Sequence, residues 1–262
     1  MAYESSPAFY RVYAGLTRIG PGSEESTARA LRCIPQMRPD APILDIGCGP
    51  GQQTLVLARI LNRAVDAIDI HQPFLDQLKE ASKIQGLSHL IRTRKISMDM
   101  LDYAPGSIDL IWCESAIYHL GVQNALRLWL PLLTADGFVC FTEISWLNEE
   151  RPAEIRGFWQ GRYPEMESVQ NNIRRIEAAG FTVADSFLLP REDDWTHFYT
   201  PLSARVAEFQ GAAVDDETAA VLANAQVKME MQERYWGCYG HIFYICKVNS
   251  RGSCCTQKEL GV

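Results

Sequence analysis

The chain has 262 residues, of which 47% are hydrophobic and 22% charged, and its net charge is −7. This composition is typical of a globular protein that is long enough to bury a core without disulfides or metals. Nucleic acid is excluded as an expected partner, because its binding needs a basic surface and no block of Lys or Arg occurs. No stretch approaches the ~20 apolar residues of a membrane span, so we expect no membrane partner.

The cysteines indicate reduced thiols. Four of the eight lie in or beside expected core strands, where a free thiol packs as a small hydrophobe: Cys48, Cys113, Cys140 and Cys246. Because the first residues also lack the pattern of a signal peptide, we expect a cytoplasmic protein. Cys254-Cys255 lies in a polar tail, 249–262, that we expect to be disordered. No His or second Cys pair at zinc spacing accompanies it, so no metal site is expected.

Strand-like and helical patterns alternate over the first 145 residues, which is typical of a parallel sheet wrapped by helices. In chain order, strands are expected at 43–46, 64–70, 90–97, 108–113 and 137–144, and helices at 52–62, 71–84 and 123–133.

After Trp146 the pattern changes to longer helical segments with two more strands. Helices are expected at 148–162, 168–179, 201–210 and 217–234, and strands at 181–189 and 239–248. We expect a single domain, 1–248, with helices inserted between its late strands.

The most informative segment is the end of the first strand, Ile43-Leu44-Asp45-Ile46, which runs directly into Gly47-Cys48-Gly49-Pro50-Gly51. Glycines allow a tight turn and a close approach of the backbone to a ligand. The helix that follows offers free N–H groups and a positive dipole end to an anionic group. This turn therefore predicts a binding site for a small anionic ligand.

Acidic residues follow four of the expected strands: Asp45, Asp69, Asp99 and Glu114. Ligands of parallel sheets bind outside the carboxyl ends of the strands. Asp69 lies 18 residues after Gly51, close to the spacing at which an acid accepts hydrogen bonds from a ribose. A nucleoside with a charged tail is thus indicated.

Two ligands compete for this pattern. A nicotinamide dinucleotide calls for G-x-G-x-x-G, but Gln52 occupies the position of the third glycine. Asp45 would also stand close to a pyrophosphate, whereas a carboxylate suits a ligand with an ammonium group. S-adenosylmethionine has an ammonium, a carboxylate, a ribose and an adenine in about this layout.

The segment Leu44–Gly51 resembles the first motif of class I S-adenosylmethionine-dependent methyltransferases, and the likeness extends over about 41–146. This region is similar to the branch that includes the ubiquinone and menaquinone C-methyltransferases. The flanks resemble a group of uncharacterised bacterial small-molecule methyltransferases. The resemblance implies a Rossmann-like α/β fold: a seven-stranded, mostly parallel sheet with an antiparallel last strand, helices on both faces and helical lid insertions. It also implies cofactor-covering helices in 1–40, a cofactor-binding core in 41–146 and lid and acceptor helices in 147–236.

The resemblance assigns roles to single residues. Asp45 would lie near the ammonium, Asp69 would hold the ribose hydroxyls, and Asp99 would accept from the adenine amino group while Met100 packs on the ring. The other expected cofactor-binding residues are Gly22, Gly47, Gly49, Gly51, Gln52, Ile70 and Glu114. Two of the acids also have purely structural readings, since Asp45 could cap the helix that follows and Asp99 could close a turn.

Candidates for chemistry follow the fourth strand. His119 could act as a base near neutral pH, with Tyr118 beside it, or it could simply pack in the loop. Aromatic residues outside this loop could line an acceptor pocket or simply form core: Tyr10, Trp146, Tyr163, Trp195 and Tyr199.

The expected function is transfer of a methyl group from S-adenosylmethionine to a small molecule. The alternatives are an NAD(P)-dependent oxidoreductase and a non-catalytic S-adenosylmethionine-binding protein. The acceptor atom (O, N, S or C) and the oligomeric state stay open at this point, with a homodimer as one option.

Overall fold

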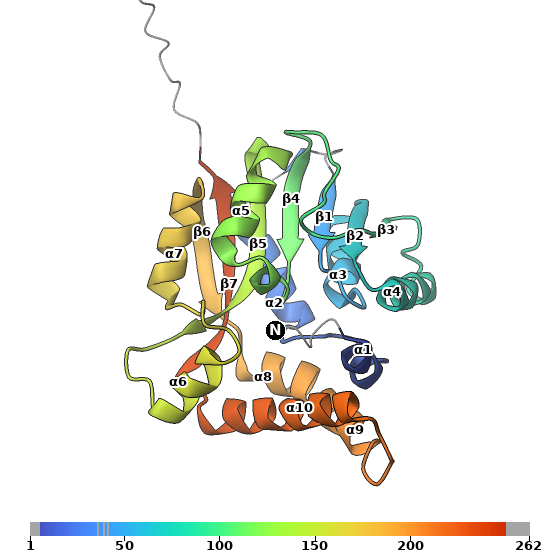
Figure 1. Ribbon diagram of the computed structural model, residues 1–262. Helices are drawn as coiled ribbons and strands as arrows, with labels where there is room; N and C mark the ends of the chain where they lie inside the picture. The colour runs from blue at the N-terminus through green and yellow to red at the C-terminus, as the bar shows by residue number, and fades with distance from the viewer. Residues whose placement is uncertain (1–5, 36, 39, 41, 250–262) are drawn as a thin grey trace, which may run out of the picture.

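The computed structural model describes residues 6–35, 37–38, 40 and 42–249. Its centre is one seven-stranded sheet in the order β3-β2-β1-β4-β5-β7-β6 (Figure 1). The strands are β1 (Ile43–Ile46), β2 (Val65–Asp69), β3 (Ile91–Lys95), β4 (Ile108–Cys113), β5 (Leu133–Trp146), β6 (Phe181–Leu188) and β7 (Tyr239–Val248).

The first five strands are parallel, and β7 is inserted antiparallel between β5 and β6. All residues of β1 and β4 are buried, as expected for central strands covered on both faces. The order reverses at β1, which pairs with β2 on one side and β4 on the other. This reversal is the switch point at which parallel sheets bind ligands.

Helices cover both faces of the sheet. On one face, α5 (Val122–Trp129) and α7 (Val169–Ala178) pack on the sheet through Leu126, Trp129 and Ile176. On the other face lie α2 (Glu24–Arg32) and α3 (Gln52–Leu61), with α4 (Gln72–Ile84) packed beside them against β2 and β3.

A third layer crosses the carboxyl end of the sheet (Figure 1). It joins α1 (Pro7–Tyr13) to α8 (Arg191–Asp194), η3 (Trp195–Tyr199), α9 (Thr200–Ala207) and α10 (Asp216–Arg234). Leu202, Val221 and Ala225 form its core with residues of α1. The short helix α6 (Ala153–Gln160) packs in a separate cluster around Trp159 and Tyr239. Segments from both ends of the chain therefore lie over the edge where a ligand is expected.

The predicted fold class is confirmed, and β7 has the predicted bounds. The helix predicted at 123–133 ends at Trp129 in a short 3-10 turn, η2 (Leu130–Leu132), because Pro131 has no backbone N–H to continue the α-helical hydrogen bonds. The fifth strand begins at Leu133, earlier than predicted. A register irregularity between Ile108 and Leu110 of β4 allows Leu133 to pair with Ile108, ahead of the regular pairing that starts at Phe138. The acidic and aromatic segment 191–199, for which no helix was predicted, is helical.

Three further findings concern the described part of the chain. None of its helices is long and apolar enough to cross a membrane. No cluster of three or more potential metal ligands occurs among these residues. Their six cysteines are free, as predicted; Cys254-Cys255 and the tail prediction lie outside the described residues, Asn249 excepted.

Candidate active site

The glycine-rich turn between β1 and α3 forms one wall of a cavity. Gly47, Gly49 and Gly51 all have positive φ, at 66°, 54° and 85°. A Cβ on Gly47 would lie 2.6 Å from the Cβ of Ala116. Only glycine therefore fits at position 47, and without a side chain there the backbone of the turn stays open to a ligand.

Gly51 packs inward and does not line the cavity. A Cβ there would lie 2.3 Å from Leu78, whose side chain is fully buried. Gly51→Ala is expected to lower the free energy of unfolding by about 2–4 kcal/mol, from left-handed strain and overpacking together. Gly86, with φ 70° and open space around it, is the matched control, and its change to Ala should cost only about 1 kcal/mol. Urea unfolding measures both; equal losses would mean that Leu78 yields to the added methyl group.

Asp69 ends β2, lines the cavity and supports the glycine turn. Its two carboxylate oxygens accept from the backbone N–H of Gly49 at 2.9 Å and of His71 at 2.8 Å. Burial raises the pKa of Asp69, and these backbone bonds oppose that rise. Each carboxylate oxygen can accept a further bond, so two adjacent hydroxyl groups could bind here.

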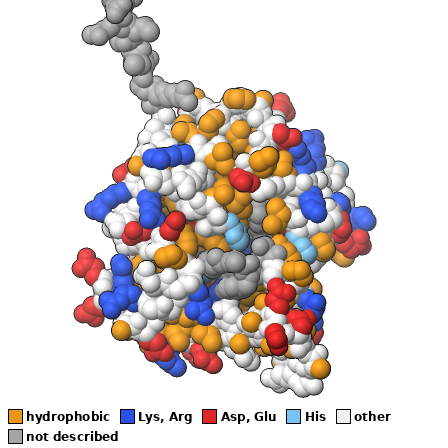
Figure 2. Space-filling view, in the orientation of Figure 1, with side chains coloured by type: hydrophobic (Ala, Val, Ile, Leu, Met, Phe, Trp, Pro, Cys, Tyr) orange, Lys and Arg blue, Asp and Glu red, His pale blue; other side chains and the backbone are white. Residues whose placement is uncertain are grey.

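The cavity has a volume of about 310 Å³, near the lower end of the usual range for small-molecule sites. Besides Asp69, Gly47 and Gly49, its walls come from α1, the segment 18–21, and the loops after β2, β3 and β4. Figure 2 shows hydrophobic and histidine side chains around the middle of this face, between the sheet and the layer of α9 and α10. We call the cavity of about 310 Å³ the outer cavity.

Besides Gly51 and Met100, three expected cofactor residues do not line the outer cavity. Asp45 is fully buried, accepts a 2.5 Å bond from Thr54 of α3, and its pKa is raised to about 7 by burial. Gln52 begins α3 behind the turn, and its neighbour Gln53 lines the cavity instead. Gly22 lies against the buried ion pair described below, where a Cβ would stand 2.8 Å from it. All three shape the turn or its support rather than the cavity wall.

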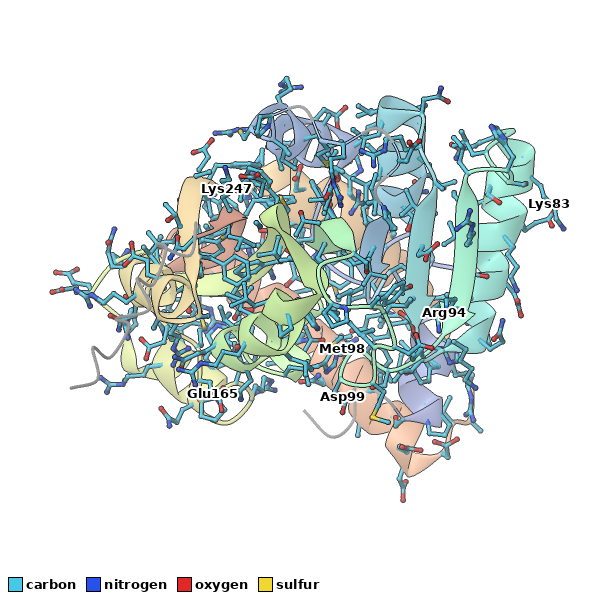
Figure 3. All side chains as sticks on the ribbon, turned by 90° about the horizontal axis from the view of Figure 1, so that it is seen from above. Lys83, Arg94, Met98, Asp99, Glu165 and Lys247 are labelled. Carbon is cyan, nitrogen blue, oxygen red and sulfur yellow. The ribbon has the colours of Figure 1, made fainter. Side chains whose placement is uncertain are left out.

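The loop after β3 contributes Met98 and Asp99 to the cavity, and Figure 3 labels both in this loop. Ser97 donates a short hydrogen bond to Asp99, which therefore also closes the turn. Met100, expected to pack on an adenine ring, is instead 70% exposed and lies outside the cavity wall. The methionine of this loop that lines the cavity is Met98, two residues earlier. Ile70, half exposed, lines the cavity as expected.

A buried ion pair joins the N-terminal segment to β4. Arg18 donates to Glu114 at 2.8 Å, and both side chains are more than nine-tenths buried. Glu114 also accepts from Thr27 at 2.7 Å and Trp112 at 2.8 Å. Both residues of the pair line the cavity. Glu114 is thus held rigidly by three donors.

Tyr118 and His119 form a short 3-10 turn, η1 (Ile117–His119), on the cavity wall. Their rings lie 4.2 Å apart. From the opposite side, Tyr10 of α1 stacks on His71 at 3.5 Å and lines the same cavity. The expected residues of these two elements therefore do meet at one site.

A second, smaller space of about 80 Å³ adjoins the first and shares Phe9, Ser115 and Tyr118 with it. We call it the inner cavity. Tyr163 and Tyr199 line it, as the acceptor prediction requires. Trp146 and Trp195 do not: Trp146 packs against Tyr239 in the α6 cluster, and Trp195, which is partly buried, packs against the core of the third layer. These two tryptophans therefore pack in or against the core, which was the alternative to a place in an acceptor pocket.

Several cavity residues were not singled out from the sequence as ligand contacts. Two of them could have been, since Gln53 directly follows the expected Gln52 and Met98 lies beside Asp99. Ser115 directly follows the expected Glu114, Arg18 belongs to the N-terminal segment that was expected to cover the cofactor, and Glu143 lies on a strand distant along the chain. Ser115 has φ +55° and donates its backbone N–H to Thr142 at 2.7 Å. Such strain at a non-glycine residue becomes visible only in the folded chain.

The comparisons with known proteins agree with this geometry. Residues 44–141 match the family model described as "Methyltransferase domain". This part of the chain is therefore similar to a methyltransferase domain. It covers the glycine turn and the ends of β2 and β4.

Two curated relatives match about half of this chain. The sarcosine/dimethylglycine N-methyltransferase of Halorhodospira halochloris is 26% identical over 126 residues, which cover 48% of this chain and 45% of that protein. The glycine/sarcosine/dimethylglycine N-methyltransferase of Actinopolyspora halophila is 25% identical over 122 residues, covering 46% and 22%. The chain therefore matches less than half the length of each.

Among solved structures, a methyltransferase from Geobacter sulfurreducens in complex with S-adenosyl-L-homocysteine is similar over nearly the whole chain. Its TM-score is 0.78 at 17% identity, covering 93% of this chain and 98% of the other. The chain thus shares the fold of that protein over nearly its whole length.

Proposed function

We propose that this protein transfers a methyl group from S-adenosylmethionine to a small-molecule acceptor, with S-adenosylhomocysteine as the second product. The observation that carries this proposal is the junction of Asp69 and the glycine turn at the switch point of the sheet. One cavity there offers an acceptor pair for two hydroxyl groups, exposed backbone for a charged tail and apolar side chains for a ring.

The described residues fit the cofactor. Gly47 and Gly49 would hold its methionine part, Asp69 its ribose, and Asp99 with Met98 and Ile70 its adenine. Arg18 of the buried ion pair lies on the cavity wall, and its guanidinium group would attract the carboxylate of the methionine part. When bound, the cofactor supplies an activated methyl group, so the protein's work is to orient the acceptor, exclude water and accept a proton where the acceptor carries one.

Tyr118 and His119 stay candidates for acting on the acceptor. Both line the outer cavity, and Tyr118 also lines the inner one. The segment 6–35, with α1 and the stretch 18–21, would cover the cofactor. We further retain as proposals the single domain 1–248, the quinone C-methyltransferase-like branch, a cytoplasmic location, a homodimer and the absence of nucleic-acid partners.

Titration calorimetry distinguishes the proposed cofactor from the alternative one. We expect S-adenosylmethionine and S-adenosylhomocysteine to bind with micromolar dissociation constants, about −8 kcal/mol, and NAD and NADP not to bind at the same concentrations. The reason is that Gln52 occupies the position of the third glycine that a dinucleotide turn requires. Binding of NAD in preference to S-adenosylmethionine would refute the proposal.

Transfer itself is tested with methyl-labelled S-adenosylmethionine and fractionated small metabolites. Label is expected to appear in a small-molecule fraction. Tight cofactor binding without any labelled acceptor would favour the non-catalytic cofactor-binding protein.

A further inference from the structure

The inner cavity contains one buried carboxylate that the cofactor site does not use. Glu143 lies on β5, beyond the last residue of β4 that pairs with that strand, and only 2% of it is exposed. One of its oxygens, Oε2, is buried and has no hydrogen-bond partner. An unpaired buried carboxylate oxygen is costly, and its presence on a cavity wall indicates a ligand that donates to it.

The other side of Glu143 is held in place. The hydroxyl group of Tyr163, which is itself part of the cavity wall, acts on the carboxylate and lowers the pKa of Glu143. This neighbour and the strand backbone limit the positions that the buried carboxylate can adopt. A fixed acceptor of this kind selects ligands by the presence of an N–H or O–H group.

The remaining walls are largely aromatic. Trp159, Phe198 and Tyr199 line the space together with Tyr118 and Tyr163. Aromatic faces attract cations, and they do so more strongly in a desolvated site. A volume of about 80 Å³ has room for roughly five water-sized groups. The occupant is therefore small, partly apolar and able to bear positive charge.

We propose that the inner cavity is the acceptor site, that it takes a small aliphatic amine, and that Glu143 binds the ammonium form and accepts its proton. This rests on the proposed methyl transfer. The inner cavity shares a wall with the outer cavity, where the methyl donor would lie. His119 does not line the inner cavity, so a proton on an acceptor held there is within the reach of Glu143 instead.

The transfer balances as follows. The protonated amine gives one proton to Glu143, and its nitrogen regains a lone pair. That pair forms the N–C bond to the methyl carbon while the S–C bond breaks, and the electrons of the broken bond stay on sulfur. The positive charge passes from sulfur to the methylated nitrogen.

The environment of Glu143 suits this role. Burial raises its pKa to about 8, against the opposing hydrogen bond from Tyr163 and the charge of Arg175, while Glu165 adds to the rise. Below this pKa the carboxyl group must lose its proton before it can pair with an ammonium ion. Amine affinity should therefore rise about tenfold per pH unit from pH 6 toward pH 8 and level off above it.

Other ionisable groups face the same space. Burial raises the pKa of Tyr163 and of Tyr199 above the usual tyrosine range, so these two stay neutral at pH 6–9. Tyr13 of α1, Tyr118 of η1, Lys228 of α10 and His241 of β7 also line it. Any pH dependence that persists without the carboxylate would belong to these groups.

The test compares diethylamine with diethyl ether, two probes of the same size of which only the amine can be charged. Binding of each to the full chain is measured by calorimetry and ligand-detected NMR, with and without S-adenosylhomocysteine, between pH 6 and 9. The wild type should bind the amine at least tenfold more tightly than the ether at pH 8. Glu143→Gln, which keeps the shape and accepts from Tyr163, should lose this preference and the pH dependence below 8.

Asp136→Asn is the matched control, because Asp136 lies on the same strand but is highly exposed and pairs with Lys247 outside the cavity. It should bind both probes as the wild type does. Equal affinity for amine and ether in the wild type, or an unchanged amine preference in Glu143→Gln, would overturn the proposal. The wild-type comparison decides the question even if the variant does not fold. Failure of S-adenosylhomocysteine to bind would instead count against the proposed methyl transfer.

Discussion

Asp69→Ala is expected to weaken S-adenosylhomocysteine binding by about 100-fold. A carboxylate that accepts from two ribose hydroxyls contributes on the order of 3 kcal/mol, since hydrogen bonds to a charged group are worth about 1.5–3 kcal/mol each. The same change removes the acceptor for the Gly49 and His71 backbone N–H groups, so the glycine turn also loses its support. Titration calorimetry measures the affinity directly.

Two further variants separate binding from folding. Asp69→Asn keeps one acceptor oxygen and should give an intermediate loss of affinity. Asp66→Ala is the matched control, because Asp66 lies on the same strand, interacts with Tyr103 and Arg92, and does not line the outer cavity. Its affinity should equal that of the wild type. If Asp69→Ala bound the ligand as tightly as the wild type, the ribose assignment would be refuted.

Arg18→Ala is expected to lower the free energy of unfolding by about 3–5 kcal/mol. The change leaves Glu114 buried without its cation, and breaking one side of a buried pair costs far more than the pair contributes. Because Arg18 anchors the segment 18–21 to β4 through this contact, cofactor affinity should fall as well. Urea unfolding and calorimetry measure the two effects.

The contrast with an exposed pair makes this prediction specific. Arg11 pairs with Asp215 at 2.7 Å, but both side chains are about half exposed. Water screens such a pair, so Arg11→Ala should leave the stability close to that of the wild type. Adding Glu114→Gln to Arg18→Ala should restore most of the lost stability, because it removes the unpaired charge. If Arg18→Ala lowered the free energy of unfolding no more than Arg11→Ala does, the ion pair of Arg18 and Glu114 would not be shielded from water.

Strand-forming patterns and the glycine turn were readable from the chain because they are local. The spacing from Gly47 to Asp69 reflects one strand–helix–strand unit, and the structure places both residues on one cavity. Register within a loop was harder to predict. Met98 and Met100 are two residues apart in a tight turn, and which of them faces the cavity depends on the turn's hydrogen bonds rather than on composition.

The aromatic residues after β5 mark the limit of sequence reasoning. Tyr163 and Trp146 are both buried aromatic residues of the same packed cluster, yet one lines the inner cavity and the other does not. Either side chain is stable in a buried position, so hydrophobicity by itself could not predict which of the two lines the cavity.

The sequence by itself determined the strands of the sheet and the glycine turn between β1 and α3, because these depend on periodicity and on glycine and acid spacing along one short segment. Only the tertiary structure decided the strand order and which side chains line the two cavities. The pairing of Arg18 with Glu114 spans 96 positions, and the inner cavity joins α1, β5, the segment after α6, η3 and α10. Contacts between such distant segments arise from the packing of the third layer onto the sheet, which leaves no periodic trace in the chain.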